Sequence, residues 1–481
     1  MVDQIKLKWL YGISALFIAL NLFFIANEIF WMPLLPIAAL IVILAIFAID
    51  ILMFIIVFLT PLAVNLTNSE FNAGLSLPVE PLMFGLMIIF LVKLLYERKF
   101  DKNITNHPIS IFIIINLVWM FITSISSTMH LVSFKFLLSR LWFVIPFYFL
   151  ATQLFINYKN IKKFIWIYTI SLIIVIFYTM FRHHEFGWTE KSAIWVMSPF
   201  YNDHTAYAAV ICLFVPVFIG FIFNKNYTPI IRIFAAFISM LFIVALLLSY
   251  TRAAWVGLAT AIGVYLIFLF RVKTSIIITG IIALITIFFI FKTDILMKLE
   301  RNRQDSSTDI KKHVQSISNI STDASNVERI NRWNCAIRMF KKKPFLGWGP
   351  GTYSFKYAPF QHSTEKTIIS TNAGNKGNAH SEYLQPLADS GIIGSLSFIL
   401  IVIAIIYRSS RLYIRTKDKE IRMLTLGLLL GLITYFVHGI MNDFLDTDKA
   451  SVPFWGFVAI LVALDVYHSK QEKETPETLE T

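Results

Sequence analysis

Long apolar segments recur along most of this chain, and they constrain its fold more than any other feature. Many of them reach the roughly 17 to 25 residues that an α-helix needs to cross the hydrocarbon core of a bilayer. Lipid offers the backbone no hydrogen-bond partners, so only helices and closed barrels span it, and barrel strands are much shorter than these segments. Only 15% of the residues are charged, compared with roughly a quarter in soluble domains. The sequence therefore predicts an all-α, polytopic integral membrane protein.

The apolar pattern predicts fourteen candidate spans. They cover residues 10–28, 31–48, 50–64, 80–96, 109–126, 136–155, 163–181, 205–223, 231–249, 254–270, 274–292, 388–407, 423–441 and 453–467. The third segment is short, and Asp50 is the only charge between it and the second, so these two could merge or form a re-entrant pair. We therefore expect twelve to fourteen transmembrane helices.

The basic residues between the spans predict the orientation of the chain. Lys and Arg gather in alternate connections, as the positive-inside rule requires of cytoplasmic loops. These residues are Arg98, Lys99, Lys102, Lys159, Lys162, Lys163, Lys225, Arg232, Arg271, Lys273, Arg408, Arg411, Arg415, Lys417, Lys419, Arg422, Lys470 and Lys473. The connections 65–79 and 127–134 contain no Lys or Arg. Both termini are therefore expected in the cytoplasm, and residues 293–387 outside it.

The polar segment 293–387 divides the chain into four parts. A bundle of eleven spans (1–292) precedes this large extracytoplasmic loop, three C-terminal spans (388–467) follow it, and a tail rich in Glu and Thr (468–481) is expected to be disordered. A long loop between spans is typical of a site that faces one aqueous side while it holds a lipid-bound molecule. An enzyme is therefore at least as well supported as a transporter.

Local signals inside the loop predict one helix and one tight turn. Ser325 and Glu328 have the spacing of a capping box, which predicts a helix that starts there and ends at the basic run 341–343. Pro344 and the glycines of 347–351 stop the helix. The glycine-rich turn follows no strand and lacks the Lys-Ser/Thr of a P-loop, so it predicts no nucleotide site.

The net charge of +13 does not indicate a nucleic-acid partner, because the basic residues lie in the short connections that the positive-inside rule explains. Cys212 lies in an apolar span and Cys335 in the polar segment, so neither a disulfide nor a thiolate metal site is expected.

Three residues could carry chemistry on the outer side. Arg252 lies where two spans meet, Arg329 lies early in the loop helix one turn before Trp333, and His380 lies just before the chain re-enters the membrane. The planar guanidinium of Arg matches phosphate oxygens and can stabilise a departing diphosphate. A neutral His can take the proton of an attacking sugar hydroxyl. If Asn378 caps a short helix, the dipole of that helix would keep the His380 imidazole neutral.

Each of these residues also has a simpler explanation, as a topological anchor, a helix-surface charge or an interfacial histidine. Other candidates are weaker. His438 lies within a span, where packing explains it best. His183, His184 and Glu185 look metal-like but share a loop. The acidic cluster Asp443, Asp446 and Asp448 lacks the pattern of a calcium loop. Arg140 is either a further phosphate contact or a snorkelling anchor.

Five motifs in order and at appropriate spacing resemble the O-antigen ligase and O-antigen polymerase family of bacterial envelope glycosyltransferases. They are SYTRAAW (249–255), ERINRW (328–333), PFLGWGPG (344–351), NAHSEYLQ (378–385) and DSGIIG (389–394). The resemblance runs from about residue 195 to the last span, and the His-containing motif before Gly-Ile-Ile-Gly is the most specific. The first third of the chain is similar only in being a stack of apolar helices.

The resemblance implies a GT-C-like helical fold and a metal-independent, inverting glycosyl transfer at the outer face of the bacterial plasma membrane, with no cofactor. The implied donor is a glycan on undecaprenyl diphosphate, and the acceptor is a glycan or a lipid-linked glycan. Other polysaccharide export proteins are possible partners. By position, Arg252 and Arg329 take the diphosphate-binding roles and His380 activates the acceptor; Arg332 competes with Arg329. Family members often have about twelve spans, fewer than the fourteen counted here.

Two other functions fit parts of the pattern. A flippase or transporter of a lipid-linked oligosaccharide suits the span count, but the single long insertion is asymmetric and charges within spans are scarce. A structural scaffold would make no single residue essential. Polymerase and ligase share the donor chemistry, so the sequence does not separate them.

Overall fold

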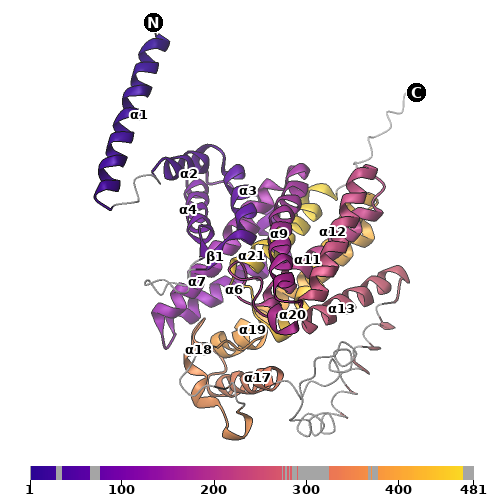
Figure 1. Ribbon diagram of the computed structural model, residues 1–481. Coiled ribbons are helices and arrows are strands. Elements are labelled where there is room, and N and C mark those ends of the chain that lie inside the picture. Colours follow the sequence, from indigo (N-terminus) through magenta and orange to yellow (C-terminus); the bar gives the residue numbers. More distant parts are fainter. Residues whose placement is uncertain are drawn as a thin grey trace, which may run out of the picture. The chain divides into compact units, whose positions relative to one another are not determined.

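The computed structural model describes residues 2–28, 35–65, 76–273, 324–366, 370 and 377–469, and isolated positions between 275 and 290. The described chain is almost entirely helical, as the sequence predicts (Figure 1). Residues 1–56 form one unit with α1 (Val2–Ala26), α2 (Leu35–Phe47) and most of α3 (Ile49–Leu59). The remaining residues form a second unit, which carries all the candidate site residues.

The second unit is a bundle of long helices joined by short connections. Its elements up to the polar segment are η2 (Thr60–Leu62), β1 (Val64–Asn65), β2 (Ser76–Leu77), α4 (Val79–Glu97), α5 (Lys102–Thr105), α6 (Pro108–Ile125), α7 (His130–Val144), η3 (Ile145–Leu150), α8 (Ala151–Leu154), α9 (Tyr158–Glu185), α10 (Glu190–Ala193), α11 (His204–Phe223), α12 (Pro229–Leu248) and α13 (Arg252–Leu269). The later elements are α17 (Ala324–Lys342), α18 (Tyr353–Lys356), η4 (Ala358–Phe360), η5 (Ser363–Glu365), α19 (Leu384–Arg415), α20 (Lys419–Met441), α21 (Asp448–Ala463) and η6 (Leu464–His468). The strands β1 and β2 pair antiparallel, with Val64 opposite Leu77.

Ten helices of the described chain are long and apolar enough to cross a membrane. They are α4, α6, α7 with η3 and α8, α9, α11, α12, α13, α19, α20, and α21 with η6. Each corresponds to one of the fourteen predicted spans. The predicted spans 10–28 and 50–64 coincide with shorter apolar helices. Much of the predicted span 274–292, the stretch 293–323 and the tail from residue 470 lie outside the described residues.

Glycines allow the central helices to approach closely. Every residue of α21 is buried, and so are most residues of α11 and α20. A Cβ added at Gly431 of α20 would lie 2.2 Å from the carbonyl oxygen of Leu213 in α11, and one at Gly427 would lie 3.0 Å from the Cα of Val217. These two glycines have the four-residue spacing of a GxxxG motif, which lets membrane helices pack backbone to backbone. The close contact fixes α20 against α11, and both helices end at the site.

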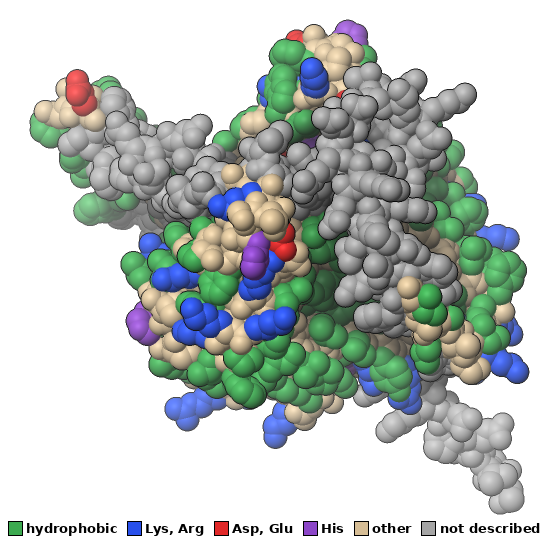
Figure 2. All heavy atoms as spheres, turned by 90° about the horizontal axis from the view of Figure 1, so that it is seen from below, with side chains coloured by type: hydrophobic (Ala, Val, Ile, Leu, Met, Phe, Trp, Pro, Cys, Tyr) green, Lys and Arg blue, Asp and Glu red, His purple; other side chains and the backbone are tan. Residues whose placement is uncertain are grey.

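The described residues of the polar segment from Ala324 onward fold on one end of the bundle, as the orange ribbon around α17 and α18 shows (Figure 1). Figure 2 views the molecule from this side, and exposed cations of the segment include Lys341, Lys342 and Lys366. Apolar residues of α17 and α18, among them Cys335, Met339 and Tyr353, form a small core of their own. Trp348 and Phe360 pack against this core with their rings edge to face. The segment is therefore a folded cap on the helix ends.

The predicted helix in this segment exists, but the predicted capping box is wrong. The helix α17 begins at Ala324, before Ser325, whose side chain lies outside the described residues. The carboxylate of Glu328 accepts hydrogen bonds from the Nε of Arg332, at 3.0 Å, and from the hydroxyl of Ser370. Because Ser325 lies inside the helix, it is not the N-cap residue that a capping box requires, and Glu328 forms an ion pair one turn along the helix. The predicted basic end at Lys341 and Lys342 is confirmed.

Candidate active site

His380 lies in an irregular segment just before α19, with its backbone at a positive φ of 50°. The indole Nε1 of Trp333 donates to the carbonyl oxygen of His380 at 3.4 Å, which ties the segment to α17. The amide of the preceding Ala379 donates to the side-chain oxygen of Gln385. The expectation that Asn378 caps a short helix is wrong, because residues 377–380 are not helical and α19 begins at Leu384. His380 is therefore held by tertiary contacts and does not lie in the first turn of a helix.

The imidazole of His380 is kept neutral by its surroundings. Burial, followed by the positive charges of Arg332 and Arg329, lowers the pKa of His380 to about 4. The carboxylates of Asp203 and Glu328 act in the opposite direction but do not outweigh these effects. At neutral pH the ring is thus unprotonated, which is the state that a general base needs. The low pKa favours the neutral imidazole, and its causes are burial and two arginines, not the helix start that the sequence predicted.

Arg332 and Arg329 differ in what they contact. The guanidinium of Arg332 pairs with Glu328, donates to the carbonyl oxygen of Asn378 at 3.1 Å and lies over the ring of Tyr357. An added Cβ at Gly377 would collide with this guanidinium. Arg332 therefore holds the segment of His380 against α17. Arg329, one turn before Trp333, lies within electrostatic range of His380.

Two further histidines lie near Arg329, with Asp203 close to both; of this group the sequence pointed only to His438, as a weaker candidate. Asp203 caps α11 by accepting the amides of Thr205 and Ala206, both at 2.8 Å, and His204 is the first residue of that helix. His204 and His438 both lie within electrostatic range of Arg329. His438 comes from α20, is 1% exposed, and has no hydrogen-bond partner for either ring nitrogen among the described residues. Its position inside an apolar span was the signal available in the sequence.

Arg252 is the first residue of α13 and is partly exposed. The preceding residues fix its position: Tyr250 has a positive φ of 51°, and the hydroxyl of Thr251 donates to the carbonyl oxygen of His204 at 3.2 Å. The structure thus joins Arg329 and His380 in one electrostatic cluster, and it attaches the segment of Arg252 to the helix start that carries His204. All three predicted site residues lie at the same end of the bundle.

The glycine-rich turn binds the start of α19. The carboxylate of Asp389 accepts the backbone amides of Gly351, at 3.0 Å, and Tyr353, at 2.9 Å, while the carbonyl oxygen of Asp389 accepts the amide of Gly349 at 2.7 Å. At Gly391 the φ is 69°, and a Cβ there would lie 2.1 Å from the carbonyl oxygen of Phe345. The turn is thus a structural clamp beside the His380 segment, consistent with the prediction that it is not a P-loop.

A buried polar network adjoins the clamp. Glu382, two residues after His380, accepts the hydroxyl of Tyr435 at 2.7 Å and the amides of Phe444 and Leu445 at 2.9 Å. Burial raises the pKa of Glu382, and the nearby positive charge of Arg140 acts in the opposite direction. Arg140 itself donates to the carbonyl oxygen of Leu445 at 2.9 Å. The predicted snorkelling or phosphate-binding arginine is thus anchored to the connection between α20 and α21.

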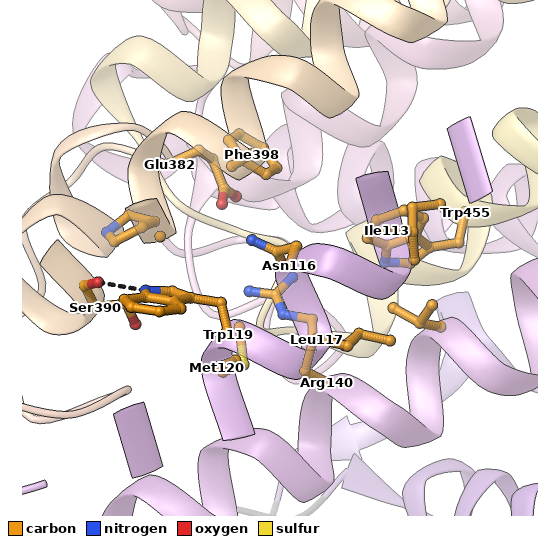
Figure 3. Close-up of a pocket in the computed structure, with 13 residues that line it drawn as sticks. Ile113, Asn116, Leu117, Trp119, Met120, Arg140, Glu382, Ser390, Phe398 and Trp455 are labelled. Atoms are coloured by element: carbon orange, nitrogen blue, oxygen red, sulfur yellow. Dashed lines mark hydrogen bonds between the residues drawn. The ribbon is translucent and has the colours of Figure 1, made fainter. Parts of the chain in front are cut away.

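Arg140 and Glu382 line two adjoining cavities of about 40 Å³ each, which have room for a few water molecules. Figure 3 shows the guanidinium of Arg140 directed toward the amide of Asn116, and the indole of Trp119 donating to the carbonyl oxygen of Ser390 at 2.8 Å. Asp443 borders the second cavity. Burial, followed by the negative charges of Asp446 and Glu382, raises the pKa of Asp443.

The residues that looked metal-like in the sequence have other contacts. The ring of His183 is buried, with its Nε2 at 3.0 Å from the carbonyl oxygen of Thr189, and it packs against Trp188. His184 is exposed. Within the described part of the chain, His, Cys, Asp and Glu side chains do not gather in groups of three or more that could hold a metal ion. His183 therefore helps to shape the connection between α9 and α10.

Comparison with known proteins agrees with the resemblance seen in the motifs. Residues 235–399 match the family described as O-antigen ligase, a range that includes Arg252, Arg329 and His380. An uncharacterized protein of Haemophilus influenzae is 24% identical over 242 residues, which cover 50% of this chain and 58% of that protein. The chain therefore matches little more than half the length of this relative. Residues 235–399 of this membrane protein are thus similar to the O-antigen ligase family, which supports the resemblance that the motifs indicate.

Proposed function

We propose that this protein is a metal-independent, inverting glycosyltransferase that transfers an oligosaccharide from undecaprenyl diphosphate to a glycan acceptor at the outer face of the bacterial plasma membrane. The acceptor is either a growing chain of the same glycan or a lipid-linked glycan. The observation that carries the proposal is a half-buried His380 with a lowered pKa, beside the guanidinium groups of Arg329 and Arg332 and within the segment that matches the O-antigen ligase family.

The reaction needs one base and one site for a leaving diphosphate. The acceptor hydroxyl attacks the anomeric carbon of the donor, the bond from that carbon to the diphosphate oxygen breaks, and the diphosphate leaves with the electron pair. His380 takes the hydroxyl proton as the new glycosidic bond forms. Attack from the face opposite the diphosphate inverts the anomeric configuration. The proposed reaction consumes no nucleotide and needs no redox partner.

Arg329 and Arg252 are proposed to bind the diphosphate. Fixed cations stabilise the charge that develops on the leaving oxygen, and a preformed site does so without reorganisation. Arg332 is assigned a positioning role because its guanidinium holds Glu328 and the carbonyl oxygen of Asn378. His204 and His438, both near Arg329, would lie beside the bound diphosphate.

Binding of the donor is proposed to change the pKa of His380. In the free protein the arginines help to hold the pKa of His380 near 4, which makes the ring a weak base. A diphosphate bound between the arginines and the imidazole opposes the arginine charges, and so raises the pKa of His380 toward neutral. The ring then becomes a stronger base only in the presence of the donor. This coupling would limit transfer to the fully assembled complex.

Orientation and substrates follow from the sequence. The basic connections, which include Arg98, Lys225 and Arg422, occur at the end of the bundle opposite His380, which supports cytoplasmic termini and an external site. Apolar side chains exposed on α12 and α13, such as Phe237 and Ile262, offer a surface to membrane lipids and to the polyprenyl chain of the donor. Other polysaccharide export proteins are proposed partners.

The test is a reaction of purified protein with synthetic undecaprenyl-diphosphate repeat units, in the presence of a metal chelator and without nucleotide. We expect a ladder of products for a polymerase, or a single transfer product when a separate acceptor is required. His380→Ala and Arg252→Ala should abolish transfer. His362→Ala, which changes an exposed histidine of the same polar segment, is the matched control and should retain it. Loss of activity on chelation, or translocation of the donor without any transfer, would contradict the proposal.

A further inference from the structure

A polar cleft lies at the end of the bundle remote from His380. It has a volume of about 530 Å³, which is in the range of small-molecule sites. It is lined by Lys102, Asn103, Asn106, His107, Pro108, Arg408, Arg415, Asp465, Val466 and Ser469. The helical stretch of α19 from Gly391 to Arg408 is roughly 25 Å long at 1.5 Å per residue. This distance separates the cleft from the proposed transfer site.

One buried carboxylate organises the cleft. The side chain of Asp465 is 4% exposed and accepts from the Nη2 of Arg408 at 2.6 Å and from the guanidinium of Arg415. The Nε2 of His107 lies 3.1 Å from the same carboxylate, and Arg415 also donates to the hydroxyl of Ser469 at 3.0 Å. The arginines are therefore held in fixed positions by η6 and by Ser469, which follows it.

The residues that line the cleft carry more positive than negative charge. Three cationic side chains, Lys102, Arg408 and Arg415, share the lining with one carboxylate, that of Asp465. Within the described part of the chain, the ammonium of Lys102 has no acidic partner within 4 Å. Burial, followed by the charges of Arg408 and Arg415, lowers the pKa of His107 to about 4, so His107 adds no positive charge at neutral pH. The lining therefore has an excess of positive charge that an anionic ligand could balance.

We infer that this cleft binds a phosphate group, with Arg408 and Arg415 as preorganised donors and Lys102 as the mobile cation at its mouth. Guanidinium groups fixed by a carboxylate suit the tetrahedral oxygens of a phosphate, and the amides of Asn103 and Asn106 offer further donors. The phosphate can be the headgroup of an anionic lipid, since basic pockets between membrane helices on the cytoplasmic side bind such groups. It can also be a soluble phosphate or diphosphate.

The experiment measures binding to the purified full-length protein in a neutral detergent. One arm uses phosphatidylglycerol, counted as retained lipid by native mass spectrometry, and the other uses inorganic phosphate and pyrophosphate, followed by isothermal titration calorimetry. Lys102→Gln removes the exposed cation without touching the Asp465 network. Lys225→Gln removes an exposed cation outside the cleft and is the matched control. Because the readout is binding, failure of the transfer reaction does not affect it.

We expect Lys102→Gln to weaken binding about fivefold, the effect of one cation near a membrane surface, and Lys225→Gln to leave it unchanged. Added salt should weaken binding, because the site is open to solvent. A response in the lipid arm alone identifies a lipid headgroup, and a response in the phosphate arm alone identifies a soluble ligand. The inference is overturned if the wild type binds none of the probes, or if both variants weaken binding equally.

Discussion

Substitution of Asp389 tests quantitatively how the polar segment is held against the membrane helices. Its carboxylate is 3% exposed and accepts two backbone amides of the glycine-rich turn, from Gly351 and Tyr353. Asp389→Ala leaves both buried donors without a partner, at about 1 to 3 kcal/mol each. The turn should therefore lose about 2 to 6 kcal/mol of docking free energy. Asp389→Asn keeps a single acceptor oxygen and should lose about half as much.

Hydrogen–deuterium exchange of residues 347–353 measures this docking directly, because local opening sets the exchange rate. At tenfold per 1.4 kcal/mol, we expect exchange to accelerate at least about 30-fold in Asp389→Ala and by a smaller factor in Asp389→Asn. Asp418→Ala is the control, since Asp418 also accepts two backbone amides but caps α20 in an exposed position. Wild-type exchange in Asp389→Ala would refute the account of the turn as a clamp.

Three further predictions follow from the site and the bundle. The acid side of the pH profile of kcat/KM should fall off near pH 4, because His380 must be neutral in the free protein. The acid side of the kcat profile should fall off at higher pH, because the bound donor raises the pKa of His380. Profiles that fall off at the same pH would contradict the proposed coupling. Arg329→Lys should reduce transfer while it preserves the fold, whereas Arg332→Lys should raise the exchange of residues 377–383; interchanged effects would reverse the two assignments. Gly431→Leu should lower the unfolding temperature in detergent markedly more than Gly263→Leu, because an added Cβ at Gly263 meets no atom within 4 Å; equal shifts would argue against close packing of α20 on α11.

Much of the fold follows from hydropathy because lipid penalises every unsatisfied backbone group. The predicted span 109–126 and the helix α6, Pro108–Ile125, differ by one residue at each end. The helix in the polar segment was also expected, and α17 ends just before Pro344 and the glycines of 347–351, as the sequence predicts. What hydropathy does not encode is which helices touch: the closeness of α11 and α20 depends on Gly427 and Gly431, whose meaning appears only when the facing backbone is known.

The site was only partly predictable. Arg329, Trp333 and His380 could be chosen because their motifs are distinctive and their chemistry suits a diphosphate. Asp203 and His204 could not, because they come from a helix start far away in the chain, and His438 stood out only as a histidine inside an apolar span.

The two local errors have one physical cause. The capping box at Ser325 and the cap at Asn378 were derived from neighbours in sequence, yet α17 begins before Ser325 and α19 begins only at Leu384. Tertiary contacts of Arg332 with Glu328 and with the backbone of Asn378 fix both segments in the folded protein.

The most direct test of the central claim is single-turnover transfer from a radiolabelled undecaprenyl-diphosphate oligosaccharide, measured for the wild type, His380→Ala and the control His362→Ala with donor binding determined in parallel. The account predicts that His380→Ala binds the donor normally but transfers at least about 100-fold more slowly, the lower range for loss of a general base. His362→Ala should match the wild type. Wild-type transfer by His380→Ala, with the donor bound as tightly, would contradict the account.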